Sequence, residues 1–268
     1  MLYPHPILNG QSAPAFFAPA AIRAFKEWGW TREDLARVAV KNHHHGAKHP
    51  KAHFRREITL DAVLNAPMVC YPLGVLDCCA MSDGAAAVIL TRPEIAKDLV
   101  GSNNYATIKA FGLAAETLFP FYRPDWTGLS AAASVKASQA AYREAGIEDP
   151  MKELDFGIVH DCFTLMELYS YQDLGLCGPG EAADLIRDGV TAIDGEFPIN
   201  PDGGLKCFGH PIGATGVRMI VEVTKQVLGR AEGYQVNDAK AGFAHNIGGP
   251  MSVGIVGIVG TPEWEPGG

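Results

Sequence analysis

The sequence has no excess of positive charge and no long apolar run. Its 22 Lys and Arg stand against 30 Asp and Glu, a formal net charge of -8. No basic stripe exists to neutralise phosphates, which argues against a nucleic-acid partner. No window approaches the run of about 18 apolar residues that a membrane helix needs. The N-terminus lacks the basic start and apolar core of a signal peptide. We therefore expect a protein that acts neither on nucleic acid nor in a membrane.

The sequence also lacks the cysteine framework of a disulfide-stabilised domain. Its six cysteines are scattered, which predicts reduced thiols and a cytoplasmic location. The adjacent Cys78 and Cys79 are too close for an unstrained bridge, so we expect small buried side chains there.

No metal site is evident either. The run His43–His45, followed by His49 and His53, lacks the spacing of a known site and a nearby carboxylate or thiolate ligand set. We predict that these histidines lie in a solvated loop and that no metal takes part in the function.

Apolar periodicity predicts a layered α/β fold. Strand-like and helix-like segments alternate through the second half of the chain, as expected for strands covered by helices. The predicted helices are 15–30, 34–43, 93–99, 131–145, 164–174 and 217–228, and the predicted strands are 85–90, 106–112, 154–159, 241–244 and 252–259.

The glycine-rich stretch 200–216 is the most distinctive part of the sequence. Gly203 and Gly204 open it, and glycine allows positive φ or a close approach to a ligand. His210 is followed by Pro211, which fixes the chain direction just before a helix. A histidine fixed there can act as a base near neutral pH, although a capping or packing histidine in a glycine-rich loop fits the same pattern.

Two other segments carry polar residues beside a predicted strand. His160 and Cys162 follow one strand, and His245 and Asn246 follow another. Each residue alone is consistent with a structural role. Because reactive groups collect at the carboxyl ends of strands in α/β sheets, we predict that these segments converge with His210 on one pocket suited to acyl chemistry.

These motifs resemble those of a known family. Residues 203–216, with Gly209-His210-Pro211-x-Gly213-Ala214-Thr215-Gly216, strongly resemble the GHPxGxSG signature of the thiolase superfamily, with threonine where serine is usual. Residues 160–163, His-Asp-Cys-Phe, resemble the HDCF motif of the sterol-carrier-protein-2-type thiolases, which replaces Asn-Glu-Ala-Phe of other thiolases. Residues 77–78 and 82–87 resemble the segment that closes the family's N-terminal half. The resemblance covers nearly the whole chain.

The resemblance implies roles for individual residues. His210 would activate the nucleophilic cysteine and help to bind the thioester oxygen. His160 would hold a water or carbonyl in the second oxyanion hole, and Cys162 would be the acid/base. The family's C-terminal Cys-x-Gly-Gly motif has no cysteine here; Asn246 falls nearest its position. The residues implied to bind substrate and coenzyme A are His245, Asn246, Gly248 and Gly249. No cofactor is implied, since coenzyme A is a substrate.

The resemblance also implies an organisation of the chain. Residues 105–268 would be a complete C-terminal thiolase domain, 67–104 the end of the N-terminal half, and 1–66 a mostly helical remnant of the loop domain. The fold would be the layered α-β-α thiolase fold with its N-terminal half largely missing, including the nucleophilic cysteine. On this basis the chain alone is not expected to complete acyl transfer. Thiolases are usually oligomers, so a homo-oligomer is implied.

Three functions follow from the resemblance. The first is an acyl-CoA acyltransferase that performs 3-oxoacyl-CoA thiolysis or Claisen condensation. The second is a thiolase-like retro-aldolase subunit that acts on steroid side-chain CoA esters with a small partner protein. The third is a non-catalytic remnant that binds coenzyme A.

Overall fold

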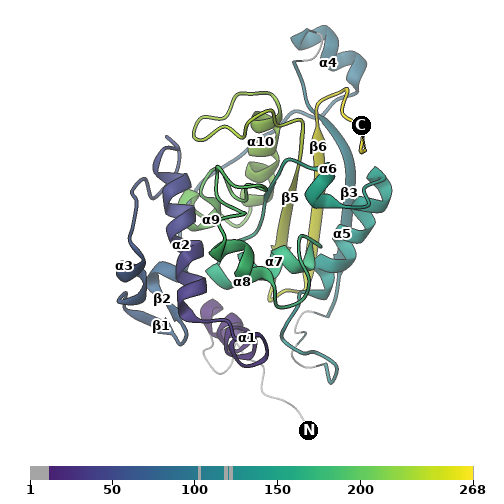
Figure 1. The fold of residues 1–268 in the computed structure, drawn as a ribbon. Helices are drawn as coiled ribbons and strands as arrows, with labels where there is room; N and C mark the ends of the chain where they lie inside the picture. The colour runs from purple at the N-terminus through teal and green to yellow at the C-terminus, as the bar shows by residue number, and fades with distance from the viewer. Residues whose placement is uncertain (1–11, 102–103, 118–119, 121–122, 268) are drawn as a thin grey trace.

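A four-stranded sheet forms the centre of the C-terminal part of the chain (Figure 1). The computed structural model describes residues 12–101, 104–117, 120 and 123–267. The strand order is β3-β6-β5-β4, with β4 parallel to β5 and the other neighbours antiparallel. The strands are β3 (Thr107–Ala115), β4 (Phe156–Ile158), β5 (Ala241–Gly248) and β6 (Val253–Gly260). Because β4 and β5 run in the same direction, the residues that follow them come together at one edge.

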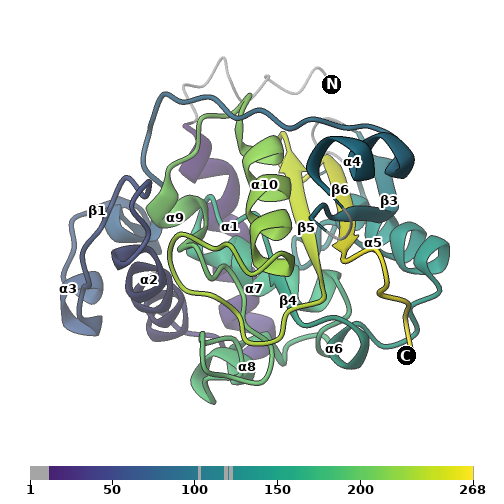
Figure 2. The same ribbon diagram turned by 90° about the horizontal axis from the view of Figure 1, so that it is seen from above.

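Helices cover both faces of this sheet (Figure 2). Helix α5 (Ala132–Ala145) packs on β3 and β6, and α10 (Thr215–Val227) packs on β5. The approach of α5 requires glycine in the strand, since a Cβ on Gly112 would lie 1.9 Å from the carbonyl oxygen of Ala137. A Cβ on Gly257 would instead meet Ile220 of α10, so α10 lies on the opposite face.

The remaining elements surround this core. Helix α2 (Arg32–Ala47) begins with a capping box, in which the side chains of Thr31 and Asp34 each accept the other residue's backbone N–H. The remaining helices are α1 (Ala13–Trp28), α2 (Arg32–Ala47), α3 (Leu60–Leu64), α4 (Pro93–Val100), α6 (Pro150–Glu153), α7 (Thr164–Asp173), α8 (Ala182–Arg187) and α9 (Gly204–Phe208), with the 3-10 turn η2 (Val75–Asp77) and a hairpin of β1 (Met68–Cys70) and β2 (Leu73–Gly74). Among the described residues, no helix is long and apolar enough to cross a membrane.

Most of the predicted elements are present, with ends shifted by a few residues. The division into 1–66, 67–104 and 105–268 stays a prediction, and the first eleven residues lie outside the described part of the chain.

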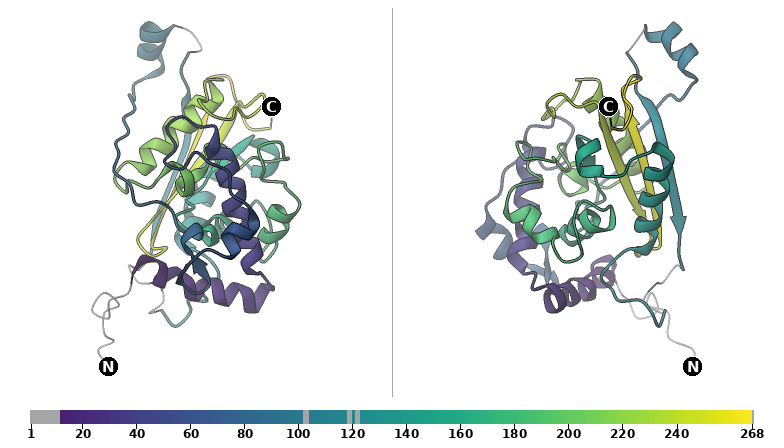
Figure 3. Two further views of the ribbon diagram at one scale, coloured as in Figure 1. Left: turned by 90° about the vertical axis from the view of Figure 1, so that its left-hand side faces the viewer. Right: turned by 45° about the vertical axis from the view of Figure 1, so that its right-hand side comes forward.

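The predicted buried strand at 85–90 is wrong. Residues 85–90 adopt no regular structure and run as an extended arm towards α4 (Figure 3), with Ile89 88% exposed. An apolar run becomes a strand only where a neighbouring strand accepts its backbone hydrogen bonds. Within the described residues this segment has no neighbouring strand, so its apolar composition and its length were not sufficient to predict a strand.

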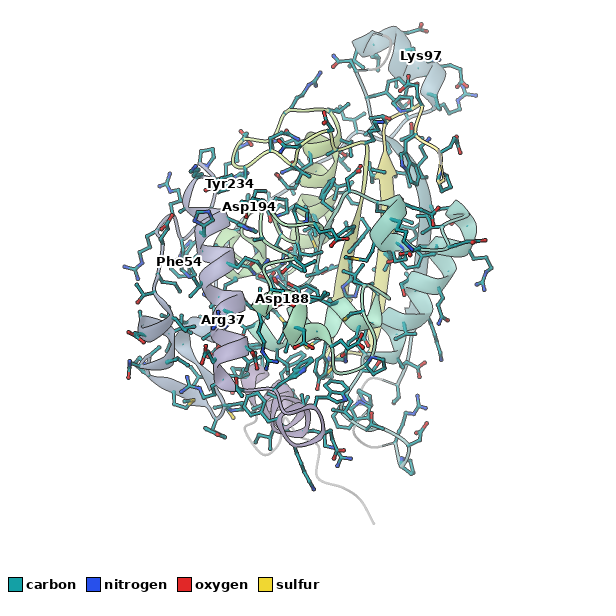
Figure 4. All side chains as sticks on the ribbon, viewed as in Figure 1. Arg37, Phe54, Lys97, Asp188, Asp194 and Tyr234 are labelled. Atoms are coloured by element: carbon teal, nitrogen blue, oxygen red, sulfur yellow. The ribbon has the colours of Figure 1, made fainter. Side chains whose placement is uncertain are left out.

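The predicted solvated histidine loop is also wrong. Residues 43–45 lie within α2, and His43, His45 and His49 are buried. His43 stacks on Phe54, which lies alongside α2 (Figure 4), and its ring nitrogen donates to the Arg56 carbonyl. Burial lowers the pKa of His43 to about 4 and that of His45 to about 3, so both rings are neutral at pH 7.

Candidate active site

His210 is fixed at the junction of α9 and α10. It follows Gly209, whose φ of 105° suits only glycine. The backbone N–H of His210 donates to Ser82 Oγ at 2.8 Å. The ring Nδ1 lies 2.7 Å from Thr215 Oγ1. That hydroxyl donates its one hydrogen to the Pro211 carbonyl at 3.1 Å. Nδ1 must therefore carry the hydrogen shared with Thr215, which leaves Nε2 as an unprotonated acceptor.

His160, which follows β4, and Asn246, which lies within β5 rather than after it as predicted, meet His210 near the C-terminal ends of these strands. His160 Nδ1 lies 2.5 Å from Asn246 Oδ1, an oxygen that can only accept. Nδ1 is thus the donor, and Nε2 of this ring is also a free acceptor. The His160 and His210 rings are perpendicular, with centroids 5.0 Å apart. The structure therefore brings these three predicted residues together.

Both imidazoles are held in the neutral form. Burial, and to a smaller extent the nearby His210, lowers the pKa of His160 to about 3. Burial and the guanidinium of Arg218 lower the pKa of His210. A neutral ring with a free Nε2 can accept a proton at pH 7, which an imidazolium cannot.

Cys162 is buried two residues after His160. It is 7% exposed, and its carbonyl accepts the N–H of Cys79 at 2.9 Å. Burial and the neighbouring Cys79 raise the pKa of the Cys162 thiol well above its ordinary value. At neutral pH the side chain is therefore a thiol that can give up a proton.

The other predicted residues lie elsewhere on β5 and its turn. His245 is fully buried on the face towards α5, where Nε2 lies 2.8 Å from Ser134 Oγ. Neighbouring strand residues point to opposite faces, so His245 does not share the side of Asn246. Gly248 ends β5, and Gly249 takes φ 61° in the turn to β6.

Asp161 connects the segment that carries His160 to the segment that leads to His210, a role that sequence reasoning did not assign. Its carboxylate accepts the backbone N–H groups of Leu205 (2.6 Å) and Lys206 (3.2 Å). A Cβ on Gly204 would lie 2.2 Å from the same carboxylate, which explains the second glycine of the pair. The side chain of Asn42 donates to Asp161 at 2.8 Å. The only signal in the sequence was the aspartate between His160 and Cys162.

A buried network of polar side chains holds the segment that carries His160 in place. Asn42 also donates to Glu167 at 2.7 Å, and Lys41 pairs with Glu167 at 2.8 Å. Asn200 donates to Glu167 at 2.7 Å, and its own Oδ1 accepts the N–H of Val159 at 2.9 Å. Helix α2 is therefore linked by hydrogen bonds to the segment that carries His160.

Two cavities have a candidate site residue in their walls. One, of about 630 Å³, lies between residues 81–86 and the loop 210–214, with His210 in its wall. The other, of about 400 Å³, is mainly apolar and has Asn246, Gly213 and Phe111 in its lining. In the described part of the chain, no group of three or more His, Cys, Asp or Glu is arranged to hold a metal ion.

The fold and the site define a layered α/β protein in which a neutral imidazole and a buried thiol follow a parallel strand, and a second neutral imidazole comes from the loop between two helices. The models for the thiolase N-terminal domain and the thiolase C-terminal domain-like family match residues 6–94 and 113–261. The chain belongs to the thiolase superfamily.

Individual relatives agree with this assignment. The chain is 40% identical to an acetyl-CoA acetyltransferase of Methanothermobacter thermautotrophicus, with 93% of this chain and 64% of the relative aligned. It is 34% identical to sterol carrier protein 2 of Bos taurus, over 94% of this chain and 46% of the relative. Among solved structures, the Ltp2-ChsH2(DUF35) aldolase has a TM-score of 0.80 and 29% identity, covering 96% of this chain and 65% of that one.

The comparisons do not support the expectation that the N-terminal half is largely missing, because residues 6–94 match the N-terminal domain model. The chain spans 64% of the length of the acetyltransferase it resembles.

Proposed function

We propose that the chain is an acyl-CoA acyltransferase that cleaves 3-oxoacyl-CoA by thiolysis, or forms it by the reverse Claisen condensation, and that coenzyme A is itself the attacking thiol because no cysteine of the chain matches the family's nucleophile. The observation that carries this proposal is the meeting of His160, His210 and Asn246, with the buried Cys162 two residues after His160 in the chain. Acyl-CoA and coenzyme A are the substrates, and no further cofactor is needed.

His210 acts as the base. Its Nδ1 is engaged by Thr215, so Nε2 accepts the proton of the coenzyme A thiol as its sulfur attacks the C3 carbonyl carbon of the 3-oxoacyl group. The ring is neutral before the reaction and becomes an imidazolium, which then stabilises negative charge on the neighbouring oxygen.

His160 and Asn246 stabilise the thioester oxygen. The free Nε2 of His160 accepts a hydrogen bond from a water, whose other hydrogen points towards the developing oxyanion. The Oδ1 of Asn246 is already engaged by His160, which leaves its Nδ2 hydrogens to donate to the same oxygen. Gly248 and Gly249 have no side chains, which leaves room near the end of β5 for the thioester end of acyl-CoA to approach the backbone.

Cys162 transfers the proton at carbon. When the bond between C2 and C3 of the 3-oxoacyl group breaks, its electron pair passes into an acyl-CoA enolate. The Cys162 thiol protonates the enolate carbon, and the proton that His210 took from the attacking coenzyme A thiol then restores the Cys162 thiol. A pKa raised by burial keeps this group as the thiol that the cleavage direction requires.

The test is a product assay with 3-oxoacyl-CoA and coenzyme A. We expect two shorter acyl-CoA products, and Cys162→Ala and His210→Ala are each expected to lower turnover at least about 100-fold. A near-wild-type rate for either variant would remove that residue from its role. No product from the wild-type chain would overturn the proposed function.

A second candidate is a retro-aldolase subunit acting on steroid side-chain CoA esters. The structural similarity to an aldolase complex at TM-score 0.80 favours it. Retro-aldol cleavage releases the same acyl-CoA enolate, so Cys162 and the oxyanion donors would keep their roles without an acylated cysteine. Aldehyde release from a 3-hydroxyacyl-CoA without added coenzyme A, in the presence of a small partner subunit, would identify this activity.

A further inference from the structure

A second cysteine lies directly opposite Cys162. Cys78 and Phe163 form an antiparallel β-bridge, and in that register the next residue pair is Cys79 and Cys162. The N–H of Cys79 donates to the Cys162 carbonyl at 2.9 Å, so the two backbones are in contact at this pair. Cys79 is half-buried, whereas Cys162 is 7% exposed.

This register is compatible with disulfide geometry. Opposed residues of a hydrogen-bonded antiparallel pair have Cα atoms about 5.5 Å apart. A disulfide accepts Cα separations of about 4.4–6.8 Å. Opposed side chains lie on the same face with Cβ atoms about 4.5–5.5 Å apart, the longer value in a hydrogen-bonded pair, so about 1–2 Å of closure reaches the Cβ spacing of a disulfide.

The neighbouring cysteine is placed differently. Cys78 precedes Cys79 and, by the alternation of an extended segment, points to the other face. Its thiol lies 3.4 Å from the Gly74 carbonyl. Cys207 is buried in α9, where its Cβ is the first atom that a Cβ on Gly46 would meet.

We propose that Cys79 and Cys162 form a reversible disulfide when a peroxide oxidises the protein. The sulfur of Cys79 attacks one peroxide oxygen and becomes a sulfenic acid, and water leaves. The Cys162 sulfur then attacks the Cys79 sulfur, the S–S bond forms, and a second water leaves. Two thiols are oxidised and one peroxide is reduced. A dithiol restores both thiols.

Cys79 is the first of the two to react. It is the more exposed thiol, and burial raises its pKa only to about 11, with the nearby Lys206 opposing the rise. Cys162 is enclosed more completely. Since the thiolate is the reactive form, oxidation becomes faster as the pH rises.

The disulfide bears on the proposed function, because Cys162 is the acid/base group there. Oxidation would remove that group and stop turnover, and reduction would restore it. The bond itself is detected chemically, so its test does not depend on the proposed activity.

The experiment treats the reduced protein with hydrogen peroxide, blocks free thiols and maps unreduced peptides by mass spectrometry. We expect one linked pair carrying Cys79 and Cys162, lighter by two hydrogen atoms, which disappears on reduction. Cys79→Ser should abolish it and leave Cys162 open to alkylation after unfolding, whereas Cys78→Ser should retain it.

Two results would overturn the proposal. One is oxidation of Cys79 or Cys162 to sulfinic acid with no linked peptide. The other is a linked peptide that contains Cys78 in place of Cys79. If Cys79→Ser does not fold, Cys79→Ala serves for the same comparison.

Discussion

Replacing His45 with asparagine should remove part of the protein's sensitivity to acid. His45 is fully buried, and its Nδ1–H donates to the Asn200 carbonyl at 2.9 Å. Burial, and to a smaller extent the nearby Lys41, lowers the pKa of His45 from 6.5 to about 3. Asparagine places its amide N–H near the position of Nδ1, so His45→Asn preserves this hydrogen bond and removes only the titration.

The sign and size follow from proton linkage. Below pH 6.5 the unfolded chain binds a proton at His45, while the folded chain does not. The stability that His45 contributes is therefore complete above that pH and is lost as the pH falls towards 3. Between pH 7 and pH 5 the loss is about 2 kcal/mol of unfolding free energy.

A single-site variant is needed because other groups oppose this effect. Burial also lowers the pKa values of three other histidines, His43, His160 and His245. Each of them lowers the free energy of unfolding as the pH falls. Asp161 and Asp173 have pKa values raised to about 7 by burial, and they bind protons in the folded state as the pH falls. The buried histidines therefore lower the stability as the pH falls and the two aspartates raise it, so only a single-site variant isolates the contribution of His45.

The assay is urea unfolding at pH 7 and pH 5. The difference in unfolding free energy between these pH values should be about 2 kcal/mol smaller in His45→Asn than in the wild type. His44→Asn is the matched control, since His44 is exposed on the same helix. An identical pH dependence in His45→Asn and the wild type would refute the burial argument.

Two further substitutions test the supports of the site. Gly204→Ala should destabilise the protein by at least about 2 kcal/mol, because its φ is 63° and its Cβ would strike Asp161; Gly213→Ala, with nothing within 4 Å, should be nearly neutral in thermal melts. Lys41→Met should cost about 3–5 kcal/mol because the buried Glu167 carboxylate loses its counter-charge and keeps only neutral hydrogen-bond donors. The exposed Lys51, paired at a similar 3.0 Å, should cost under about 1 kcal/mol when changed to Met, and equal costs for the two lysines would contradict this reasoning.

Local signals explain which elements could be predicted from the sequence. The capping box at Thr31 and the alanine-rich segment that ends at Gly146 determine α2 and α5 within a few residues of chain. The meeting of His160 with Asn246 also followed from sequence, because parallel strands place their carboxyl ends at one edge.

Long-range contacts explain the errors and omissions. His45 is buried by a partner 155 residues away, and no local pattern indicates that contact. Asp161 holds backbone N–H groups 44 and 45 residues further along the chain. The run 85–90 has strand composition, but strand formation depends on a neighbouring strand rather than on composition.

The most direct test of the proposed chemistry is hydrogen exchange at the α-carbon of acetyl-CoA in heavy water. We predict that the wild-type chain incorporates deuterium at this carbon, faster as the pH rises, because the Cys162 thiolate takes that proton while the water on His160 and the Asn246 amide hold the enolate oxygen. Cys162→Ala should lose the incorporation and still bind acetyl-CoA. Binding without any exchange by the wild-type chain would contradict the account and would leave only a coenzyme A-binding protein.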